Sequence, residues 1–85
     1  MTRESLTDRV RLLVAEIAGP SRTPAGAGWD TPLWDGGFWL TSAELLEAVL
    51  SCEQEFGVNF AGELGGEMLR SVDTLAAAVW AKREA

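Results

Sequence analysis

The side chains that could do chemistry in this chain are few: it has no histidine, one cysteine and thirteen carboxylates. The absence of histidine rules out His-based catalytic triads, His-containing zinc sites and the commonest general base. Cys52 falls at an apolar position of an expected helix, which favours a buried thiol over a nucleophile. Glu44 and Glu47 are spaced as neighbours on one helix face, but nothing apolar is arranged to raise the pKa of either. An enzyme that uses these two carboxylates is therefore the least favoured hypothesis.

Ser42 is the residue best placed for covalent modification. It lies inside Thr41-Ser42-Ala43-Glu44, which fits a capping box. In that motif the Thr side chain accepts a bond from the backbone N–H three residues on, and the Glu side chain reaches back. The motif predicts Thr41 as the N-cap and Ser42 as the first helical residue. Its hydroxyl would lie beside the positive end of the helix dipole, where an attached phosphate is favoured. The alternative is an ordinary serine at a helix start.

Acidic residues are concentrated around this serine. The chain carries a net charge of −6, but residues 30–73 alone carry −8, with nine acidic residues and one basic residue, Arg70. Such a field repels nucleic acid and anionic lipid and attracts partners with basic patches. The concentration of charge favours a docking surface over a merely solvated acidic face.

The length of 85 residues predicts one small domain, residues 1–85, with no second core. A hydrophobic content of 47% suits a folded domain, and no apolar run is long enough to span a bilayer. The first residues lack a signal-peptide pattern, and a single cysteine excludes an internal disulfide. We therefore expect a cytoplasmic, monomeric protein that does not bind membranes.

Residues 4–17 carry one apolar stripe at helical spacing, which predicts a first helix. Gly19-Pro20 ends it, because glycine can supply a left-handed residue and proline cannot continue the helix. The start of the helix stays open among three possible caps, Thr2, Ser5 and Thr7.

A long connection rich in glycine and proline follows over residues 21–40. Its large apolar residues could tie it to the core; they are Trp29, Leu33, Trp34, Phe38 and Leu40. Core filling is the simplest interpretation of these tryptophans. The alternative is an exposed aromatic that contacts a bound group or a partner, and Trp39, three positions before Ser42, is the best candidate.

The second predicted helix runs from Ser42 to about Phe56 and carries two stripes. One faces the core. The other combines apolar residues with carboxylates: Ala43, Leu46 and Leu50 alternate with Glu44, Glu47 and Glu53. An apolar row bordered by acids suits a partner whose groove takes the apolar side chains and whose Arg or Lys meets the acids. The alternative is that Leu46 and Leu50 also lie in the core.

After Gly57 the helical signal weakens. Residues 63–69 hold a short helix at best, because Gly65 and Gly66 each cost about 1 kcal/mol relative to alanine. The last helix begins at Ser71, a good N-cap. These elements predict an all-α fold, a small bundle of three or four helices with a long loop between the first two.

The stretch from Leu33 to Gly57 resembles the acyl carrier proteins. The resemblance lies in Gly36-Gly37, in Leu40-Thr41-Ser42-Ala43 at the helix start and in Glu53-Gln54-Glu55-Phe56-Gly57 at its end. It implies an acyl-carrier-like bundle in which Ser42, the only matching serine, carries 4′-phosphopantetheine as a phosphodiester. Two positions depart from the family: Thr41 replaces its Asp and Ala43 its Leu. Since both neighbours help the modifying transferase, we expect weaker or more selective modification of Ser42.

The resemblance further implies a carrier that holds an acyl or aminoacyl group as a thioester and passes it between biosynthetic enzymes. An acyl carrier is favoured over a peptidyl carrier, because a Gly-Gly-x-Ser-Leu signature is absent. The atypical Leu-Thr-Ser-Ala core and four tryptophans point to polyketide-type secondary metabolism.

The implied partners are a phosphopantetheinyl transferase and acyl-transferring enzymes with basic docking patches. The residues expected to meet them are Trp39, Thr41, Ala43, Glu44, Leu46, Glu47, Leu50 and Glu53. The alternative hypothesis is an interaction module of the same fold without the prosthetic group, and the departures at Thr41 and Ala43 favour it.

Overall fold

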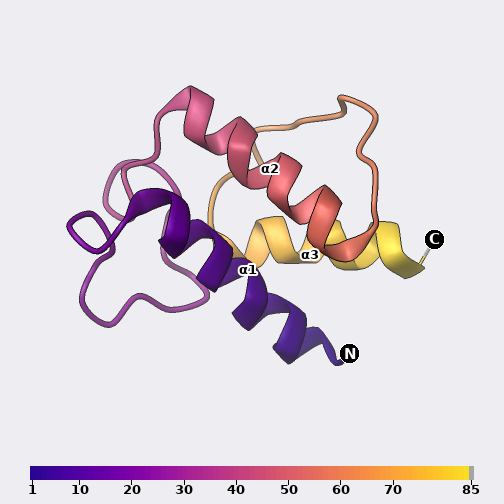
Figure 1. Ribbon diagram of the computed structural model, residues 1–85, viewed down its shortest axis with the longest axis horizontal. Coiled ribbons are helices and arrows are strands. Elements are labelled where there is room, and N and C mark those ends of the chain that lie inside the picture. Colours follow the sequence, from indigo (N-terminus) through magenta and orange to yellow (C-terminus); the bar gives the residue numbers. More distant parts are fainter. Residues whose placement is uncertain (85) are drawn as a thin grey trace.

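The computed structural model describes residues 1–84, which form three helices: α1 (Arg3–Ala18), α2 (Ser42–Phe56) and α3 (Val72–Glu84). The same residues contain no strand, only an isolated antiparallel bridge between Pro32 and Ser71. Helix α1 runs opposite to α2 and α3 (Figure 1). It packs against both of them more extensively than they pack against each other. No helix among these residues combines the length and the apolarity that crossing a membrane would require. The all-α prediction is confirmed, with three helices.

The ends of α1 and α2 follow from local side-chain and glycine chemistry. Thr2 caps α1, where its hydroxyl accepts a bond of 3.0 Å from the Ser5 N–H. This bond decides the start that the sequence left open. Gly57 ends α2 in the left-handed conformation, at φ 66° and ψ 35°. Gly19 ends α1 at φ 81° and ψ 165°. Its φ is positive as predicted, but its ψ lies outside the left-handed helical region.

Helix α3 is capped by the long connection rather than by its own serine. The Ser71 hydroxyl donates to the Asp73 carboxylate, so it does not serve as the expected N-cap acceptor. Instead the N–H of Val72 donates to the Thr31 carbonyl at 3.2 Å, and that of Asp73 donates to the Trp29 carbonyl at 2.7 Å. The first free N–H groups of a helix need such partners. The α1–α2 connection therefore fixes where α3 begins.

Residues 57–71 return the chain from α2 to α3 without forming a further helix. Ala61 and Gly62 have φ of 54° and 78°, which a right-handed helix excludes. Gly65 and Gly66 follow, and only isolated turns form, such as the 3.2 Å bond from the Leu69 N–H to the Gly66 carbonyl. The short helix considered for residues 63–69 is absent.

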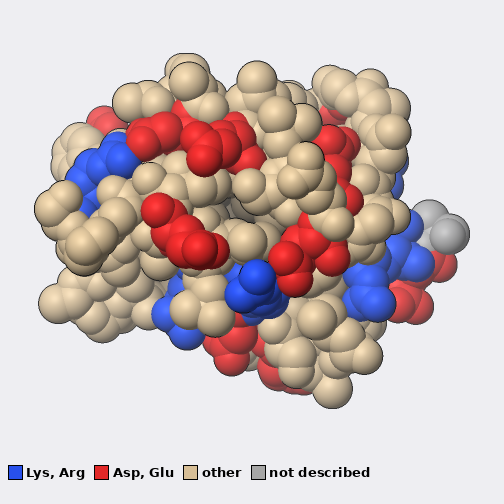
Figure 2. All heavy atoms as spheres, in the orientation of Figure 1, with Lys and Arg blue, Asp and Glu red and all other residues tan. Residues whose placement is uncertain are grey.

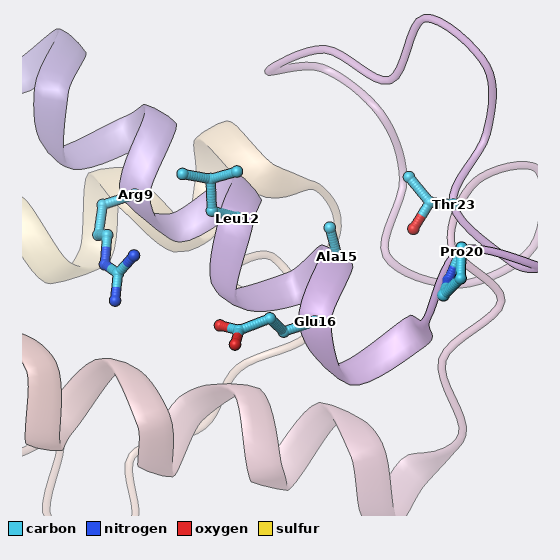
Figure 3. Close-up of a pocket in the computed structure, with 6 residues that line it drawn as sticks. All are labelled: Arg9, Leu12, Ala15, Glu16, Pro20 and Thr23. Carbon is cyan, nitrogen blue, oxygen red and sulfur yellow. The ribbon is translucent and has the colours of Figure 1, made fainter.

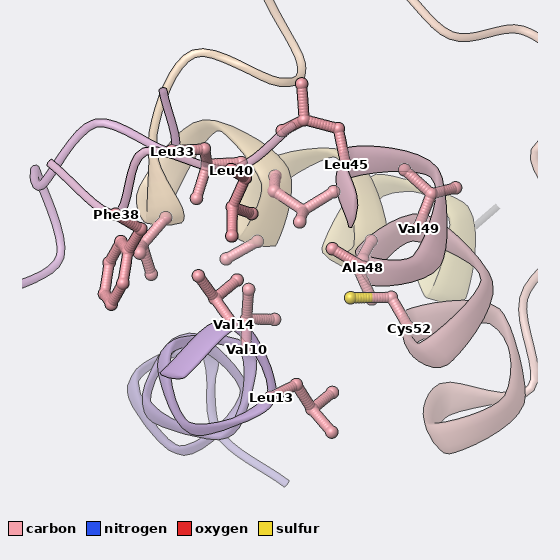
Figure 4. Packing of buried hydrophobic residues seen from close by; sticks show 14 of the residues in the cluster. Val10, Leu13, Val14, Leu33, Phe38, Leu40, Leu45, Ala48, Val49 and Cys52 are labelled. Carbon is pink, nitrogen blue, oxygen red and sulfur yellow. The ribbon is translucent and has the colours of Figure 1, made fainter. Parts of the chain in front are cut away.

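The core lies between the three helices and under the α1–α2 connection. Three residues of that connection, Leu33, Phe38 and Leu40, are buried with the apolar stripes of α1 and α2 (Figure 4). Cys52 belongs to this cluster, and burial raises the pKa of its thiol to about 12. The predicted burial of the Cys52 thiol is confirmed. A thiol with that pKa stays protonated at neutral pH.

The tryptophans of the connection do not fill the core. Trp29 and Trp34 are 40% and 42% exposed. Each is held at the surface by a hydrogen bond from its indole N–H. The indole of Trp29 donates to the Asp8 carboxylate at 2.7 Å, and that of Trp34 donates to the Leu69 carbonyl at 2.6 Å. The core-filling interpretation is wrong for them. Tryptophan has a polar N–H that must find a partner, so it can anchor a loop without being buried.

Gly37 sits where the connection folds tightly onto itself. The N–H of Phe38 donates to the Pro32 carbonyl at 3.0 Å, and the N–H of Leu40 donates to the Leu33 carbonyl at 2.9 Å. A Cβ atom on Gly37 would lie 1.9 Å from the Pro32 carbonyl oxygen. Only glycine fits this close approach of two backbone segments.

We expect Gly37→Ala to lower the free energy of unfolding by about 2 kcal/mol, because the Pro32 backbone must move to admit the methyl group. Urea unfolding followed by circular dichroism measures the change. Gly66→Ala is the matched control, since a Cβ there meets no atom within 4 Å. Equal stability of the two variants would contradict this account of the loop.

Candidate functional site

Ser42 is the first residue of α2 and is exposed. The cap before it has both halves of the predicted capping box. The Glu44 N–H donates to the Thr41 hydroxyl at 3.2 Å, and the Thr41 N–H donates to the Glu44 carboxylate at 3.0 Å. The predicted helix start is therefore confirmed. The cap uses the Thr41 hydroxyl and leaves that of Ser42 uncommitted among the described residues.

Arg22 braces this helix start, a role that sequence analysis missed. Its guanidinium donates to both carboxylate oxygens of Glu44, at 2.7 and 2.5 Å. The same side chain donates to the Ala18 carbonyl at 3.0 Å, at the C-terminal end of α1. A cation at a helix C-terminus satisfies carbonyls that have no partner within the helix. Arg22 thus ties the last turn of α1 to the first turn of α2.

The ion pair changes the acid–base behaviour of Glu44. Its pKa falls from an ordinary 4.5 to about 2, first because Arg22 donates hydrogen bonds to the carboxylate and second because the Thr41 N–H does. Hydrogen bonds to the charged form stabilise that form. Such a carboxylate is ionised at neutral pH and cannot supply a proton there.

Trp39 is the most exposed of the tryptophans in the α1–α2 connection, at 57%. It also has φ of 56°, in the left-handed region that costs a residue with a Cβ about 1–2 kcal/mol. The backbone N–H of Trp39 donates to the Trp34 carbonyl at 2.9 Å, and its backbone carbonyl accepts a hydrogen bond from the Arg22 guanidinium at 3.4 Å. A glycine would adopt this conformation without strain. The chain therefore holds a large aromatic in solvent, close to Ser42, at a cost to the fold.

The outward face of α2 carries the predicted apolar row. Leu46 and Leu50 are each 49% exposed, and Ala43 and Glu47 are exposed as well. The alternative that the two leucines lie in the core is wrong.

The acids of α2 differ in what they contact. The Glu53 carboxylate accepts the Phe60 N–H at 2.8 Å, and Glu55 pairs with Arg9 at 3.1 Å. With Glu44 bound to Arg22, Glu47 is the acid of α2 that makes no salt bridge or side-chain hydrogen bond within residues 1–84. That Glu44 and Glu53 meet a partner's basic groups stays a prediction. Glu44 has both oxygens bound, whereas the second oxygen of Glu53 can still accept a hydrogen bond.

No set of three or more metal-ligating side chains gathers anywhere in residues 1–84. A shallow hollow of about 510 Å³ lies against α1 and the turn after it, with Leu12 and Ala15 as its apolar part. Arg9 and Glu16 also line it, and in Figure 3 the Glu16 carboxylate extends along α1 toward the side of Arg9. Because no residue of α2 lines the hollow, it is not part of the Ser42 site.

Comparison with known proteins adds nothing to these observations: no family model matches the chain, and no curated protein or solved structure matches it either.

The free energy of unfolding should depend on pH through the ionisation of Glu44. Because its folded pKa lies below its ordinary value, the pair with Arg22 contributes fully above about pH 5 and is lost as the pH falls toward 2. We expect Glu44→Gln to lower the Tm at pH 7, with the difference from wild type shrinking steadily below pH 5. Thermal unfolding between pH 2.5 and 7 measures this. Gln still serves in a capping box, so the variant isolates the charge.

Glu47→Gln is the control, because Glu47 makes no salt bridge within residues 1–84. Its Tm should stay near that of wild type across the same range. A Glu44→Gln difference that did not change with pH would show that the pair with Arg22 does not lower the pKa of Glu44.

Proposed function

We propose that the chain is a carrier protein that holds an acyl group as a thioester on 4′-phosphopantetheine attached to Ser42. The observation that carries the proposal is the exposed Ser42 hydroxyl at the first position of α2, beside an intact capping box. A phosphodiester there would face the positive end of the helix dipole. The chain would present this group to other enzymes and would not itself catalyse a reaction.

The outer face of α2 also supports the proposal, because its side chains suit recognition by a partner enzyme. Leu46 and Leu50 are half exposed, with Glu47 exposed beside them and Trp39 exposed before the helix. A modifying transferase or an acyl-transferring enzyme with an apolar groove and a basic patch would fit this combination. Polyketide-type biosynthesis is the pathway we propose, on the sequence resemblance alone.

A carrier-like module without the prosthetic group is the second candidate. The Thr41 hydroxyl favours it, because that hydroxyl accepts the Glu44 N–H and serves the cap. An aspartate at this position could still cap the helix and would add a negative charge beside Ser42. Thr41 supplies no such charge.

The first test is the intact mass of the protein after incubation with coenzyme A, Mg²⁺ and a broad-specificity phosphopantetheinyl transferase. We expect a gain of one phosphopantetheine in wild type and none in Ser42→Ala. Ser51→Ala is the matched control, because Ser51 lies in the middle of α2 and should not be modified. No gain with this enzyme or with the transferase of the native host would overturn the carrier proposal and leave the interaction module.

Within the same assay, Thr41→Asp should be modified faster than wild type. The substitution restores an acidic group beside the serine while keeping a good N-cap. An unchanged rate would mean that Thr41 is not the reason for selective modification.

Trp39→Gly separates recognition from folding. We expect the Tm to stay the same or rise, because glycine adopts a positive φ without strain. The modification rate should fall about tenfold, as for the loss of one aromatic anchor from an interface. Ala61→Gly is the control, since it relieves a similar φ of 54° at an exposed position and removes no aromatic ring. Equal modification rates for Trp39→Gly and wild type would exclude a contact by Trp39.

A further inference from the structure

Arg22 uses the whole donor capacity of its guanidinium. It makes five hydrogen bonds, one for each N–H group that an arginine side chain has. Two go to the carbonyls of Ile17 and Ala18, at 3.4 and 3.0 Å, and two go to the Glu44 carboxylate. The remaining one goes to the Trp39 carbonyl at 3.4 Å. A planar group bound on all its edges has one orientation, so Arg22 connects Trp39 to both helices.

The pair with Glu44 fixes that orientation. In Figure 2, a basic side chain touches an acidic one over the region where α1 ends and α2 begins, which is where Arg22 and Glu44 pair. Both side chains are only partly exposed. Two parallel bonds between a guanidinium and a carboxylate hold the two groups in a defined geometry. Glu44 therefore determines how Arg22 meets the Trp39 carbonyl.

The peptide unit after Trp39 is held from both sides. Its N–H, which belongs to Leu40, donates to the Leu33 carbonyl at 2.9 Å, and its carbonyl accepts the bond from Arg22. Within residues 1–84, Arg22 is the one hydrogen-bond partner of that carbonyl. Phe38 and Leu40, on either side of Trp39, lie in the core (Figure 4). Arg22 thus holds the one polar group of this peptide unit that the connection itself does not hold.

This hold matters because the φ of Trp39, 56°, is unfavourable for a residue with a Cβ atom. Without a partner for its carbonyl, the residue could relax toward a negative φ. Rotation of the backbone at this residue would move the exposed indole. Because Trp39 lies three positions before Ser42, the move would change the aromatic surface close to the serine.

We infer that Arg22 is a positioning residue, which holds Trp39 in its left-handed conformation and so presents the exposed indole to the enzyme that modifies Ser42. The inference rests on the proposed carrier function and deepens it, because it assigns the conformation of Trp39 to a side chain that joins α1 to α2. The role of Arg22 is indirect, since its donors are committed within the chain.

A double-mutant cycle between Arg22 and Trp39 tests the hold on the unmodified protein. Arg22→Lys keeps the positive charge beside Glu44 but replaces the planar fork by a point charge. If Arg22 holds the strained backbone, Trp39→Gly relieves strain only while Arg22 is present. We therefore expect the effect of Trp39→Gly on the Tm to be more favourable by about 4 °C in wild type than in Arg22→Lys, as measured by thermal unfolding.

Arg9→Lys is the matched control. Arg9 also binds an acid of α2 through two hydrogen bonds, to Glu55, but its side chain bonds to no backbone carbonyl within residues 1–84. The effect of Trp39→Gly on the Tm should therefore be the same in Arg9→Lys as in wild type. An equal effect in Arg22→Lys as well would overturn the inference, because the buried neighbours of Trp39 would then hold it by themselves.

The modification assay tests the presentation of the indole by separating KM from kcat. We expect Arg22→Lys to raise the KM of the transferase for this chain about fivefold at unchanged kcat, because a smaller share of the molecules presents the indole. In the Trp39→Gly background, Arg22→Lys should raise the KM no further. A fall in kcat at unchanged KM, or an equal rise in KM in both backgrounds, would overturn the positioning role of Arg22.

The two measurements distinguish a failure of this inference from a failure of the carrier proposal. If wild type is not modified at all, the carrier proposal fails, and the presentation of the indole to a transferase fails with it. The Tm cycle requires no modification of Ser42. It therefore decides independently whether Arg22 holds Trp39.

Discussion

The bond between Arg22 and Glu44 is the constraint on which the rest of the structure depends. Through it, a single side chain holds the Ala18 carbonyl at the end of α1 and the carboxylate in the first turn of α2. The same carboxylate also completes the cap by accepting the Thr41 N–H. The position of the exposed Ser42 is therefore set by a bond between two residues that are 22 positions apart in the sequence. A small domain with a limited core gains rigidity from such a link between two helices.

The long α1–α2 connection stabilises the fold although it has no regular secondary structure. Its carbonyls at Trp29 and Thr31 receive the first N–H groups of α3, and its residues Leu33, Phe38 and Leu40 fill the core. A connection without regular structure normally leaves polar backbone groups to water. Here backbone groups of the connection bond to one another, and those of Trp29, Thr31 and Leu33 bond to the start of α3 and the residues just before it. Among the glycines of the connection, Gly37 permits a close approach of two backbone segments, whereas Gly26 and Gly36 supply a positive φ with open space around them.

Sequence patterns predicted the helices because the signals were local. The capping box at Thr41 and the apolar period of α2 act within a few residues, and both are confirmed. What the sequence could not reveal depends on distant partners. Nothing near Arg22 indicates that it pairs with Glu44, and nothing near Ser71 indicates that Trp29 and Thr31 supply the cap of α3. The exposed tryptophans were misjudged because hydrophobicity alone places them inside, whereas the indole N–H decides where they lie.

The acids of α2 separate into structural and available groups, and this separation changes how the charge of the chain should be understood. Glu44, Glu53 and Glu55 hold the fold by binding Arg22, the Phe60 N–H and Arg9. Both carboxylate oxygens of Glu44 are already bound, whereas Glu53 uses only one oxygen and can accept a further hydrogen bond. The field of the whole chain would still draw a basic protein toward it. Glu47 is the acid of α2 that makes no salt bridge or side-chain hydrogen bond within residues 1–84, so its charge is available to such a protein. A surface that looks uniformly acidic in composition is therefore selective in the places where it can bind.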